Sequence, residues 1–550
     1  MAEPPVSDRN ISRRLTEMAR LDPDRPAVIA PSGRAISFAQ LDERSTQLAA
    51  GLAVAGVRPG MKLVLFVPFS IEFVELTFAL FKTGAIVVLI DPGMGRANIF
   101  NCLNEVQPDG FVAVPIVHVV RWFAGGASRR AALNFCVGPW LPGITATYRQ
   151  LIRTDAHSFA VRQSAATDSA AIIFTSGSTG PPKGVLYEHG MFDAQVDLIR
   201  DRYGIVPGDV DLPGFPLFGL FNSAMGVTTV IPDMDPTRPA EVDPEKILKA
   251  IQQHNVTQAF GSPAFWNRVG RYCAEKNLTL PTLKRALSAG GPVPGHVLQR
   301  MSNILTRPDA DLFTPYGATE SLPVSSIGAR EILESTAPLT KQGAGTCVGT
   351  TFPGMRVKIL PMTDGPISSI NAITELPPGE IGEIVVCGPS VTREYYQRPD
   401  STRLAKIPDG DGFWHRIGDV GYLDSTGRLW FCGRKAHVVV TPNETMFSVC
   451  CEAIFNEHPR IYRSALVGIG PRGQQRPAIV AEPEPGQFPK TPADEQQLRD
   501  ELLALGRQHA HTQNIRDILF HPSLPVDTRH NVKINREALA MWAAPKFKPA

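Results

Sequence analysis

The chain has 550 residues, a formal net charge of +2 and 20% charged residues. This length exceeds what one hydrophobic core fills, so we expect two or more domains. The small net charge gives no reason to expect binding to nucleic acid or to a charged membrane surface. The eight cysteines show no metal-ligand spacing, and the first 20 residues lack an apolar core. We therefore expect a cytoplasmic protein with reduced thiols and no signal peptide.

The N-terminal residues predict a helix, a hairpin and a second helix. Residues 10–20 have the apolar spacing of a short amphipathic helix. Residues 27–30 and 35–36 flank a Pro-Ser-Gly-Arg turn, which is typical of a β-hairpin. Ser37 and Gln40 have the spacing of a capping box, so a helix is expected to begin after Ser37.

The most apolar region, residues 63–91, is interrupted by charged side chains, which argues against a membrane span. It divides into a strand, a helix and a strand over residues 63–67, 71–81 and 86–90. Strands and helices then alternate to about residue 300, with strands expected at 111–114 and 258–260 and helices at 192–199 and 246–254. This alternation predicts an α/β fold with mostly parallel sheets flanked by helices.

A loop rich in glycine and hydroxyl groups follows the apolar run 171–174, which itself predicts a short buried strand. The loop reads TSGSTGPPKG over residues 175–184. Its backbone N–H groups and hydroxyls suit phosphate oxygens, and Lys183 adds a mobile positive charge. It is not a Walker A motif, because Gly184 and not Ser or Thr follows the lysine. A surface turn is the alternative, but the specificity of the run favours phosphate binding.

Three later stretches are also rich in small residues, and the second and third contain charged residues as well. They read LSAGGP at 287–292, TPYGATE at 314–320, and RIGDVGY at 416–422 followed by GRLWFCGRK at 427–435. Each alone could be a turn or a solvated loop. After Lys435 the composition shifts to a compact α+β segment. We therefore divide the chain into a large domain, 1–434, and a small one, 435–550.

In their order and approximate spacing, these motifs resemble the adenylate-forming superfamily, which includes acyl-CoA synthetases, adenylation domains of peptide synthetases and firefly-type luciferases. The resemblance extends from about residue 10 to 542. It implies a large N-terminal AMP-binding domain and a small mobile C-terminal lid, with the hinge at Lys435. It also implies that a substrate carboxylate attacks the α-phosphate of ATP, which requires positive charge and Mg²⁺.

The resemblance implies roles for single residues. It assigns ATP binding to Thr175, Ser176, Gly177, Ser178, Thr179, Gly180, Lys183, Gly290, Gly291, Tyr316, Gly317, Thr319, Asp419 and Arg434. Within this set, Tyr316 offers its aromatic face to adenine and Thr319 hydrogen-bonds the α-phosphate. Glu320 is the Mg²⁺ ligand. Asp419 accepts from the ribose diol, and Arg434 donates toward ribose or phosphate.

A late lysine completes the implied catalytic set of Lys183, Thr319, Glu320 and Lys533. In the superfamily this lysine reaches into the site from the small domain and stabilises charge on the bridging oxygen of the adenylate. Lys533 lies in the run DTRHNVKINR at 527–536, where Val532 replaces the usual glycine. A surface lysine is the alternative.

Two departures indicate that CoA is not used. CoA-dependent members carry a glycine-containing loop after the hinge, whereas residues 441–448 read TPNETMFS. Many also have histidine in a Pro-Leu-Phe-His run, whereas residues 216–221 read PLFGLF. The runs at 230–239, 343–349, 430–435 and 527–534 resemble one subgroup, the β-lactone synthetases of bacterial long-chain olefin biosynthesis.

In that subgroup a 2-alkyl-3-hydroxy fatty acid is adenylated, and its own β-hydroxyl displaces AMP to give a β-lactone. An intramolecular nucleophile has a high effective concentration, so no thiol is needed. His437 and His530 are candidate bases for ring closure, although either could be structural. The resemblance implies a long-chain β-hydroxy acid as the substrate. It also implies other olefin-pathway enzymes as partners.

Two other functions stay open at this stage. One is a long-chain fatty acid–CoA ligase. The other is a non-catalytic nucleotide-binding scaffold, against which the presence of Lys183, Glu320, Asp419 and Lys533 argues.

Overall fold

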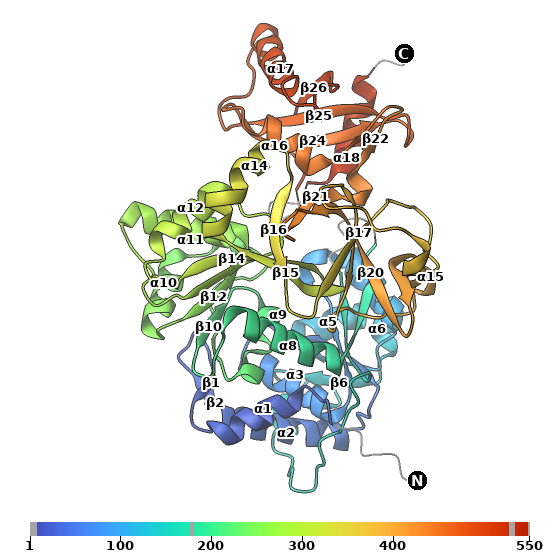
Figure 1. Cartoon of the computed structure of the whole chain (residues 1–550). Helices are drawn as coiled ribbons and strands as arrows, with labels where there is room; N and C mark the ends of the chain where they lie inside the picture. Colours follow the sequence, from blue (N-terminus) through green and yellow to red (C-terminus); the bar gives the residue numbers. More distant parts are fainter. Residues whose placement is uncertain (1–7, 176–180, 527–533, 548–550) are drawn as a thin grey trace.

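The structure is a computed structural model that describes residues 8–175, 181–526 and 534–547. Within these ranges the strands form two large sheets, a three-stranded sheet and a two-stranded ladder. In Figure 1 the C-terminal elements stand at one end of the molecule, above the two large sheets. No helix in the described ranges is both long enough and apolar enough to cross a lipid bilayer.

The first large sheet has seven strands, and all neighbouring pairs except the last are parallel. Its order is β7 (Ala146–Thr147), β6 (Leu133–Cys136), β5 (Gly110–Ala113), β3 (Lys62–Phe66), β4 (Ile86–Leu89), β8 (Ser169–Phe174) and β9 (Gly184–Glu188). The predicted strand–helix–strand over 63–90 is confirmed as β3, α3 (Ile71–Thr83) and β4.

The second large sheet has fourteen strands and changes character at β14. Its order is β17 (Arg356–Leu360), β18 (Gly382–Cys387), β20 (Gly412–Leu423), β21 (Leu429–Arg434), β16 (Thr346–Thr351), β15 (Ser321–Gly328), β14 (Asp311–Ala318), β13 (Arg285–Ser288), β12 (Gln258–Gly261), β10 (Val210–Pro213), β11 (Thr228–Val230), β1 (Pro26–Ile29) and β2 (Ala35–Ser37), with β19 (Lys406–Asp409) paired to β20. From β14 to β1 the pairs are parallel, and from β14 to β17 they are antiparallel.

The predicted α/β class is therefore confirmed, and the parallel strands fall in the region where the sequence alternates between strand and helix. The α-helices are α1 (Ser12–Leu21), α2 (Phe38–Val54), α3 (Ile71–Thr83), α4 (Arg96–Val106), α5 (Pro115–Phe123), α6 (Ala127–Arg130), α7 (Tyr148–Leu151), α8 (His189–Tyr203), α9 (Pro216–Gly219), α10 (Pro244–Gln253), α11 (Pro263–Lys276), α12 (Gly295–Ile304), α13 (Ala329–Glu331), α14 (Ala337–Lys341), α15 (Pro399–Ala405), α16 (Ser448–Phe455), α17 (Pro492–Gly506) and α18 (Arg536–Ala543). The predicted hairpin is confirmed as the antiparallel pair β1–β2. The predicted capping box is also confirmed, because the Gln40 N–H donates to the Ser37 hydroxyl at 3.3 Å and the Ser37 N–H to the Gln40 side chain at 3.0 Å.

The strands after Arg434 belong to separate sheets. β22 (Val439–Val440) pairs with β23 (Thr445–Met446), and β24 (Ile461–Ile469), β25 (Arg476–Pro483) and β26 (Asp517–Phe520) form the three-stranded sheet. Helices α16, α17 and α18 accompany this sheet in Figure 1. This α+β segment begins close to the predicted boundary at Lys435, which stays a prediction.

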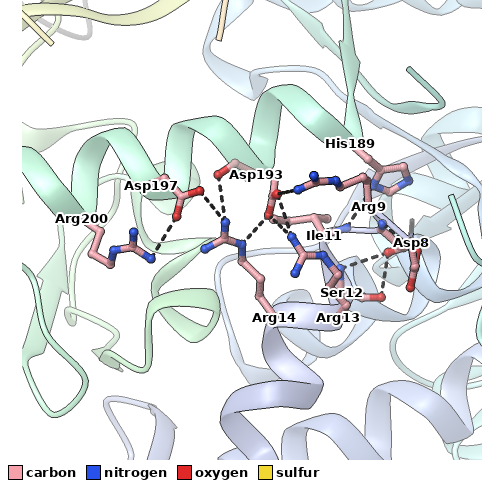
Figure 2. Close-up of polar contacts among 11 residues, drawn as sticks. Asp8, Arg9, Ile11, Ser12, Arg13, Arg14, His189, Asp193, Asp197 and Arg200 are labelled. Atoms are coloured by element: carbon pink, nitrogen blue, oxygen red, sulfur yellow. Dashed lines mark hydrogen bonds and ion pairs between the residues drawn. The ribbon is translucent and has the colours of Figure 1, made fainter. Parts of the chain in front are cut away.

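Helix α1 is attached to α8 by charged side chains around Asp193 (Figure 2). The Asp193 carboxylate, whose side chain is 8% exposed, accepts hydrogen bonds from Arg13 at 2.8 and 2.9 Å and from Arg9 at 3.4 Å, and it also pairs with Arg14. Burial by itself raises the pKa of Asp193, but the hydrogen bonds and charges of Arg14 and Arg13 outweigh it and lower the pKa. The N-terminal arm, residues 9–14, thus fixes the position of α8.

His189, the first residue of α8, makes a second contact with this arm. Its Nδ1 atom accepts a hydrogen bond from the Ile11 N–H at 3.3 Å (Figure 2). The ring also packs edge-on against Phe81, with centroids 5.8 Å apart. Burial lowers the pKa of His189 from 6.5 to about 4. The ring is therefore neutral at pH 7, as an acceptor for the Ile11 N–H must be.

Acid should destabilise the protein through this histidine. Between pH 6.5 and pH 4 the unfolded chain binds a proton at His189 and the folded chain does not, so the free energy of unfolding falls as the pH is lowered. Complete loss of this contribution amounts to about 3 kcal/mol. Denaturant unfolding of the wild type and of His189→Asn at a series of pH values measures the difference. His254→Asn, on a histidine outside this contact, should keep the wild-type dependence of the unfolding free energy on pH. The same pH dependence in all three proteins would contradict the assignment.

Candidate active site

The predicted phosphate-binding loop joins β8 to β9 at the carboxyl ends of the parallel strands. The Thr175 N–H donates to the Lys183 carbonyl at 3.0 Å, and the Lys183 N–H donates to the Thr175 hydroxyl at 3.1 Å. These two bonds close the loop at its base. Carboxyl edges of parallel sheets are the usual place for ligand sites. Outside the described residues lie the predicted loop residues Ser176, Gly177, Ser178, Thr179 and Gly180.

Tyr395 holds the predicted magnesium ligand, Glu320, in the turn between β14 and β15. Its hydroxyl donates to Glu320 Oε1 at 2.6 Å. Its ring lies under the Lys183 ammonium, with Nζ 4.9 Å from the ring centroid, which is a cation–π contact. Burial, together with the charge and hydrogen bond of Glu320, raises the pKa of Tyr395, so the hydroxyl keeps its proton and stays a donor.

The backbone of this turn is held as well. The N–H and hydroxyl of Thr392 donate to the Glu320 carbonyl at 2.9 and 3.1 Å. The Lys406 ammonium in turn donates to the Thr392 carbonyl. Burial lowers the pKa of Lys406 to about 7, while the Glu320 charge acts in the opposite direction. On the other side, the Tyr187 hydroxyl donates to the carbonyl of Thr319.

Tyr187, Tyr395 and Lys406 were not among the predicted site residues. Tyr395 reaches the site because its backbone pairs with Val185 of β9 as an isolated bridge. Such a pairing joins residues more than 200 positions apart, and the sequence around Tyr395 contains no signal for it. Tyr187 offered a weak signal, since it follows the phosphate loop directly, in the apolar run 185–187.

Tyr316, Asp419 and Arg434 form a second group. Asp419 and Arg434 face each other across β20 and β21, and Arg434 Nη1 lies 3.1 Å from Asp419 Oδ1. The Tyr316 hydroxyl donates to Asp419 Oδ2 at 2.6 Å. Burial raises the pKa of Tyr316, and the Asp419 charge raises it further. The hydroxyl is therefore a fixed donor, and a tilted Phe431 ring 6.1 Å away limits the position of the Tyr316 ring.

Glycine is required at two predicted positions for different reasons. A Cβ atom on Gly317 would lie 2.6 Å from the Ser321 carbonyl oxygen, so no side chain fits there. Gly290 has φ +96°, a backbone conformation that side-chain-bearing residues rarely adopt. Gly290 and Gly291 follow β13, so they bring backbone and not side chains to the carboxyl edge of the sheet.

The structure brings the described predicted residues to a single cavity of about 2170 Å³. Its lining includes Thr175, Lys183, Gly290, Gly291, Tyr316, Gly317, Thr319, Glu320, Asp419, Arg434, Lys435 and His437. Two predicted residues, His530 and Lys533, lie outside the described residues. Phe192, Val196 and Ile199 of α8 also line the cavity, and we call this apolar part of its wall the apolar arm.

Lys435, the predicted hinge residue, is anchored by a buried carboxylate. Its Nζ atom lies 3.1 Å from Glu383 Oε2 and also donates to the Thr363 carbonyl. The same carboxylate accepts two hydrogen bonds from Arg416, at 2.9 and 2.7 Å. Glu383 is therefore shared between a residue of the large sheet and the first residue of the C-terminal segment.

The candidate base His437 faces the C-terminal helix α18. Its Nε2 atom lies 3.5 Å from Glu537 Oε1. Burial, together with the charges of Arg536 and Arg434, lowers the pKa of His437 to about 4, although Glu537 acts in the opposite direction. The imidazole is neutral at pH 7, which is the form that a base requires.

The donor set around Glu320 suits Mg²⁺ better than a transition metal. Within the described ranges no three His, Cys, Asp or Glu side chains come together as a metal cluster. Mg²⁺ is commonly held by one or two carboxylates together with substrate phosphates and water. Tyr395 occupies one oxygen of Glu320, Oε1. A single carboxylate next to a phosphate-type loop therefore fits a magnesium ion that is shared with a nucleotide.

Thr175 and Lys183, at the base of the glycine-rich loop, and two separate carboxylates, Glu320 and Asp419, line one cavity of a two-sheet α/β fold. This arrangement is the one expected of an adenylate-forming ligase. Residues 15–396 match the family model described as AMP-binding enzyme, and the chain belongs to this family.

Two curated relatives are similar over nearly their whole length. The chain is 44% identical to an olefin beta-lactone synthetase of Xanthomonas campestris pv. campestris, with 97% of each chain covered. It is 43% identical to an olefin beta-lactone synthetase of Stenotrophomonas maltophilia, with 98% of this chain and 99% of the relative covered.

Solved structures agree with the fold. ATP-bound MatB from Rhodopseudomonas palustris superposes with a TM-score of 0.78 at 21% identity, covering 98% of this chain and 100% of MatB. MenE from Bacillus subtilis, in complex with ATP and magnesium ion, superposes with a TM-score of 0.73 at 21% identity, covering 95% and 98%.

Removing the charge of Glu383 should destabilise the protein strongly. Glu383→Gln leaves the buried Arg416 guanidinium without a counter-charge and removes the nearer of the two carboxylates beside the Lys435 ammonium. Breaking a buried ion pair costs about 3–5 kcal/mol. Urea unfolding monitored by circular dichroism measures the change. The matched control is Glu375→Gln, which breaks an exposed 2.9 Å pair with Lys358 and should cost less than about 1 kcal/mol. Equal losses of unfolding free energy in Glu383→Gln and Glu375→Gln would refute the explanation by a buried charge.

Proposed function

We propose that this protein uses ATP to adenylate a long-chain 2-alkyl-3-hydroxy carboxylic acid and then forms a β-lactone, as the acid's own β-hydroxyl displaces AMP. The observation that carries the proposal is the similarity to two olefin beta-lactone synthetases, at 44% and 43% identity over nearly the whole chain. The apolar arm of the cavity supports a long-chain substrate.

In the first half-reaction the residues around the cavity bring together two anions. The loop 175–184 and Lys183 would bind the β- and γ-phosphates, and Thr319 would hydrogen-bond the α-phosphate. Mg²⁺, when bound at Glu320, neutralises phosphate charge. Tyr395 keeps Glu320 in place through its 2.6 Å hydrogen bond and orients Lys183 through its ring. Positive charge near the bridging oxygen would come from Lys533.

Nucleoside binding would fall to the second group of residues. The Asp419 carboxylate would accept from the ribose hydroxyls while it keeps the hydrogen bond from Tyr316. Arg434 holds Asp419 from the other side and would also reach ribose or phosphate. The ring of Tyr316, fixed by its hydroxyl, would pack against adenine.

The second half-reaction needs a base but no thiol. His437 is neutral and lines the cavity, so it would accept the proton of the β-hydroxyl; His530 is the other candidate. The segment that replaces the CoA loop forms a tight turn between β22 and β23, closed by a 2.9 Å hydrogen bond from the Thr441 N–H to the Glu444 carbonyl. Residues 435–550 would act as a lid that rotates about Lys435 between the half-reactions.

A product assay tests the proposal directly. The full-length protein is incubated with ATP, Mg²⁺ and a 2-alkyl-3-hydroxy fatty acid, with and without CoA, and the products are identified by mass spectrometry. We expect AMP and a β-lactone in both reactions, because the nucleophile belongs to the substrate. A CoA thioester would replace the lactone proposal with an acyl-CoA ligase. Failure to release AMP with any acid would leave a nucleotide-binding scaffold.

Lys533→Ala should slow adenylation at least 100-fold while leaving ATP affinity within about twofold, because the lysine acts on charge that develops in the transition state. Single-turnover AMP formation and fluorescence titration with an ATP analogue measure the two quantities. Lys546→Ala, in the same C-terminal region and over the Trp542 ring, is the matched control and should keep both near wild type. Unchanged adenylation in Lys533→Ala would remove this residue from the mechanism.

A further inference from the structure

A row of polar side chains crosses the parallel half of the fourteen-stranded sheet. Thr229, Asp211, Gln258 and Arg285 are direct neighbours on β11, β10, β12 and β13. Neighbours in register point to the same face of a sheet, so these four side chains form one line. All four are at least nine-tenths buried. The adjacent residues Leu212, Ala259 and Ala286 belong to the apolar cluster on the opposite face.

Asp211 is the member of this row with unused hydrogen-bonding capacity. Its Oδ2 atom accepts a hydrogen bond from Asn222 Nδ2 at 2.6 Å. Its Oδ1 atom is buried and accepts no hydrogen bond of ordinary geometry from any described residue. The residue as a whole is 3% exposed, and it lines the same cavity as the nucleotide-site residues.

The cation nearest in the row is already committed elsewhere. Arg285 pairs with Asp209, donates to the Gln258 side chain at 3.3 Å and donates to the Tyr203 carbonyl at 3.3 Å. It therefore weakens but does not remove the effect of burial on Asp211. Burial raises the pKa of Asp211 to about 7, against the hydrogen bond of Asn222, the polar contact of the Gln258 side chain and the charge of Arg285. The carboxyl can therefore take up a proton near neutral pH, and the protonated form donates as well as accepts.

Many of the side chains that share the cavity with Asp211 are apolar. They include Val196 and Ile199 of α8, with Phe221, Met225 and Phe260. An alkyl chain fits such walls. A purely apolar chain end would, however, leave the Asp211 oxygen without a partner and without water, which costs about 1–3 kcal/mol.

The polar row is too far from the reacting groups to contact the substrate's β-hydroxyl. In register the row continues from Arg285 to Asp311, the first residue of β14. Thr319 and Glu320 follow Ala318, the last residue of β14, which is seven residues further along the strand. Seven residues of extended strand span about 23 Å. A group that reaches Asp211 must therefore be carried well along the alkyl chain.

We propose that the apolar arm of the cavity ends in a polar subsite, in which Asp211 hydrogen-bonds a hydroxyl or carbonyl group carried by the alkyl chain of the substrate. This inference rests on the proposed function and extends it, because it assigns the acid a second oxygen function far from its carboxylate. Asn222 orients the Asp211 carboxyl, since it donates at once to Asp211 and, at 3.1 Å, to the Thr229 hydroxyl.

A binding experiment that needs no turnover tests the subsite. The probes are a long-chain saturated fatty acid and a series in which one hydroxyl is moved along the same chain. Their affinities for the full-length protein follow from displacement of a fluorescent fatty acid. We expect one position, or two or three adjacent positions, to bind about fivefold tighter than the parent acid, the size of one net hydrogen bond.

Two variants at the subsite and one control complete the test. Asp211→Leu should abolish the preference for the hydroxylated chain while leaving the affinity for the parent acid equal or higher. Asp211→Asn, which keeps the shape and a hydrogen-bonding group, should retain part of the preference and covers the case in which Asp211→Leu does not fold. Asp311→Asn, at the end of the same row and away from the cavity, should behave as wild type. No preferred hydroxyl position, or a preference that persists in both Asp211 variants, would overturn the proposal.

The product assay keeps this inference separable from the proposed function. If the protein releases no AMP but shows a positional preference that depends on Asp211, the subsite is upheld and the lactone reaction is refuted. A β-lactone formed by a protein without any positional preference upholds the reaction and refutes the subsite.

Discussion

The candidate nucleotide site depends on a single side chain, Tyr395, which contacts both Glu320 and Lys183. The hydroxyl fixes Glu320 and the ring lies under Lys183, so the carboxylate and the ammonium have a common support. The support is itself set by backbone pairing between Tyr395 and Val185 of β9. Glu320 lies in a turn of the fourteen-stranded sheet, and Lys183 directly precedes β9 of the seven-stranded one. Tyr395 therefore also links the two sheets at the point where a polyphosphate would bind.

Two buried carboxylates elsewhere follow one rule: each is given more than one charged partner. Asp193 meets three arginines, and Glu383 meets an arginine and a lysine. Removing a charge from water is costly, and several hydrogen bonds are needed to offset that cost. Asp211 departs from this rule, since its Oδ2 atom has Asn222 and its Oδ1 atom accepts no hydrogen bond of ordinary geometry from the described residues. Because Asp211 also lines the cavity, we propose it as a ligand contact.

Much of the fold could be predicted from local patterns. Alternating apolar runs indicated the parallel strands, and Ser37 with Gln40 indicated a helix start, because these signals lie within a few residues of one another. Motif order placed Thr175, Glu320 and Asp419 in one site, and the structure brings these residues to one cavity. Tyr395, Lys406 and Asp211 could not be predicted in the same way. Their roles depend on which distant strands become neighbours and in what register, and short-range sequence patterns carry no such information.

The Glu383 carboxylate, which Arg416 and Lys435 share, has a consequence for the energy of a domain rotation at Lys435. If the backbone turns at Lys435 and withdraws its ammonium, Glu383 still keeps both hydrogen bonds from Arg416. No bare anion is left in the interior, and the released ammonium moves toward solvent, where hydration replaces the lost partner. In such a rotation Lys435 would separate from Glu383 at low energetic cost, and Arg416 would keep Glu383 paired in either position.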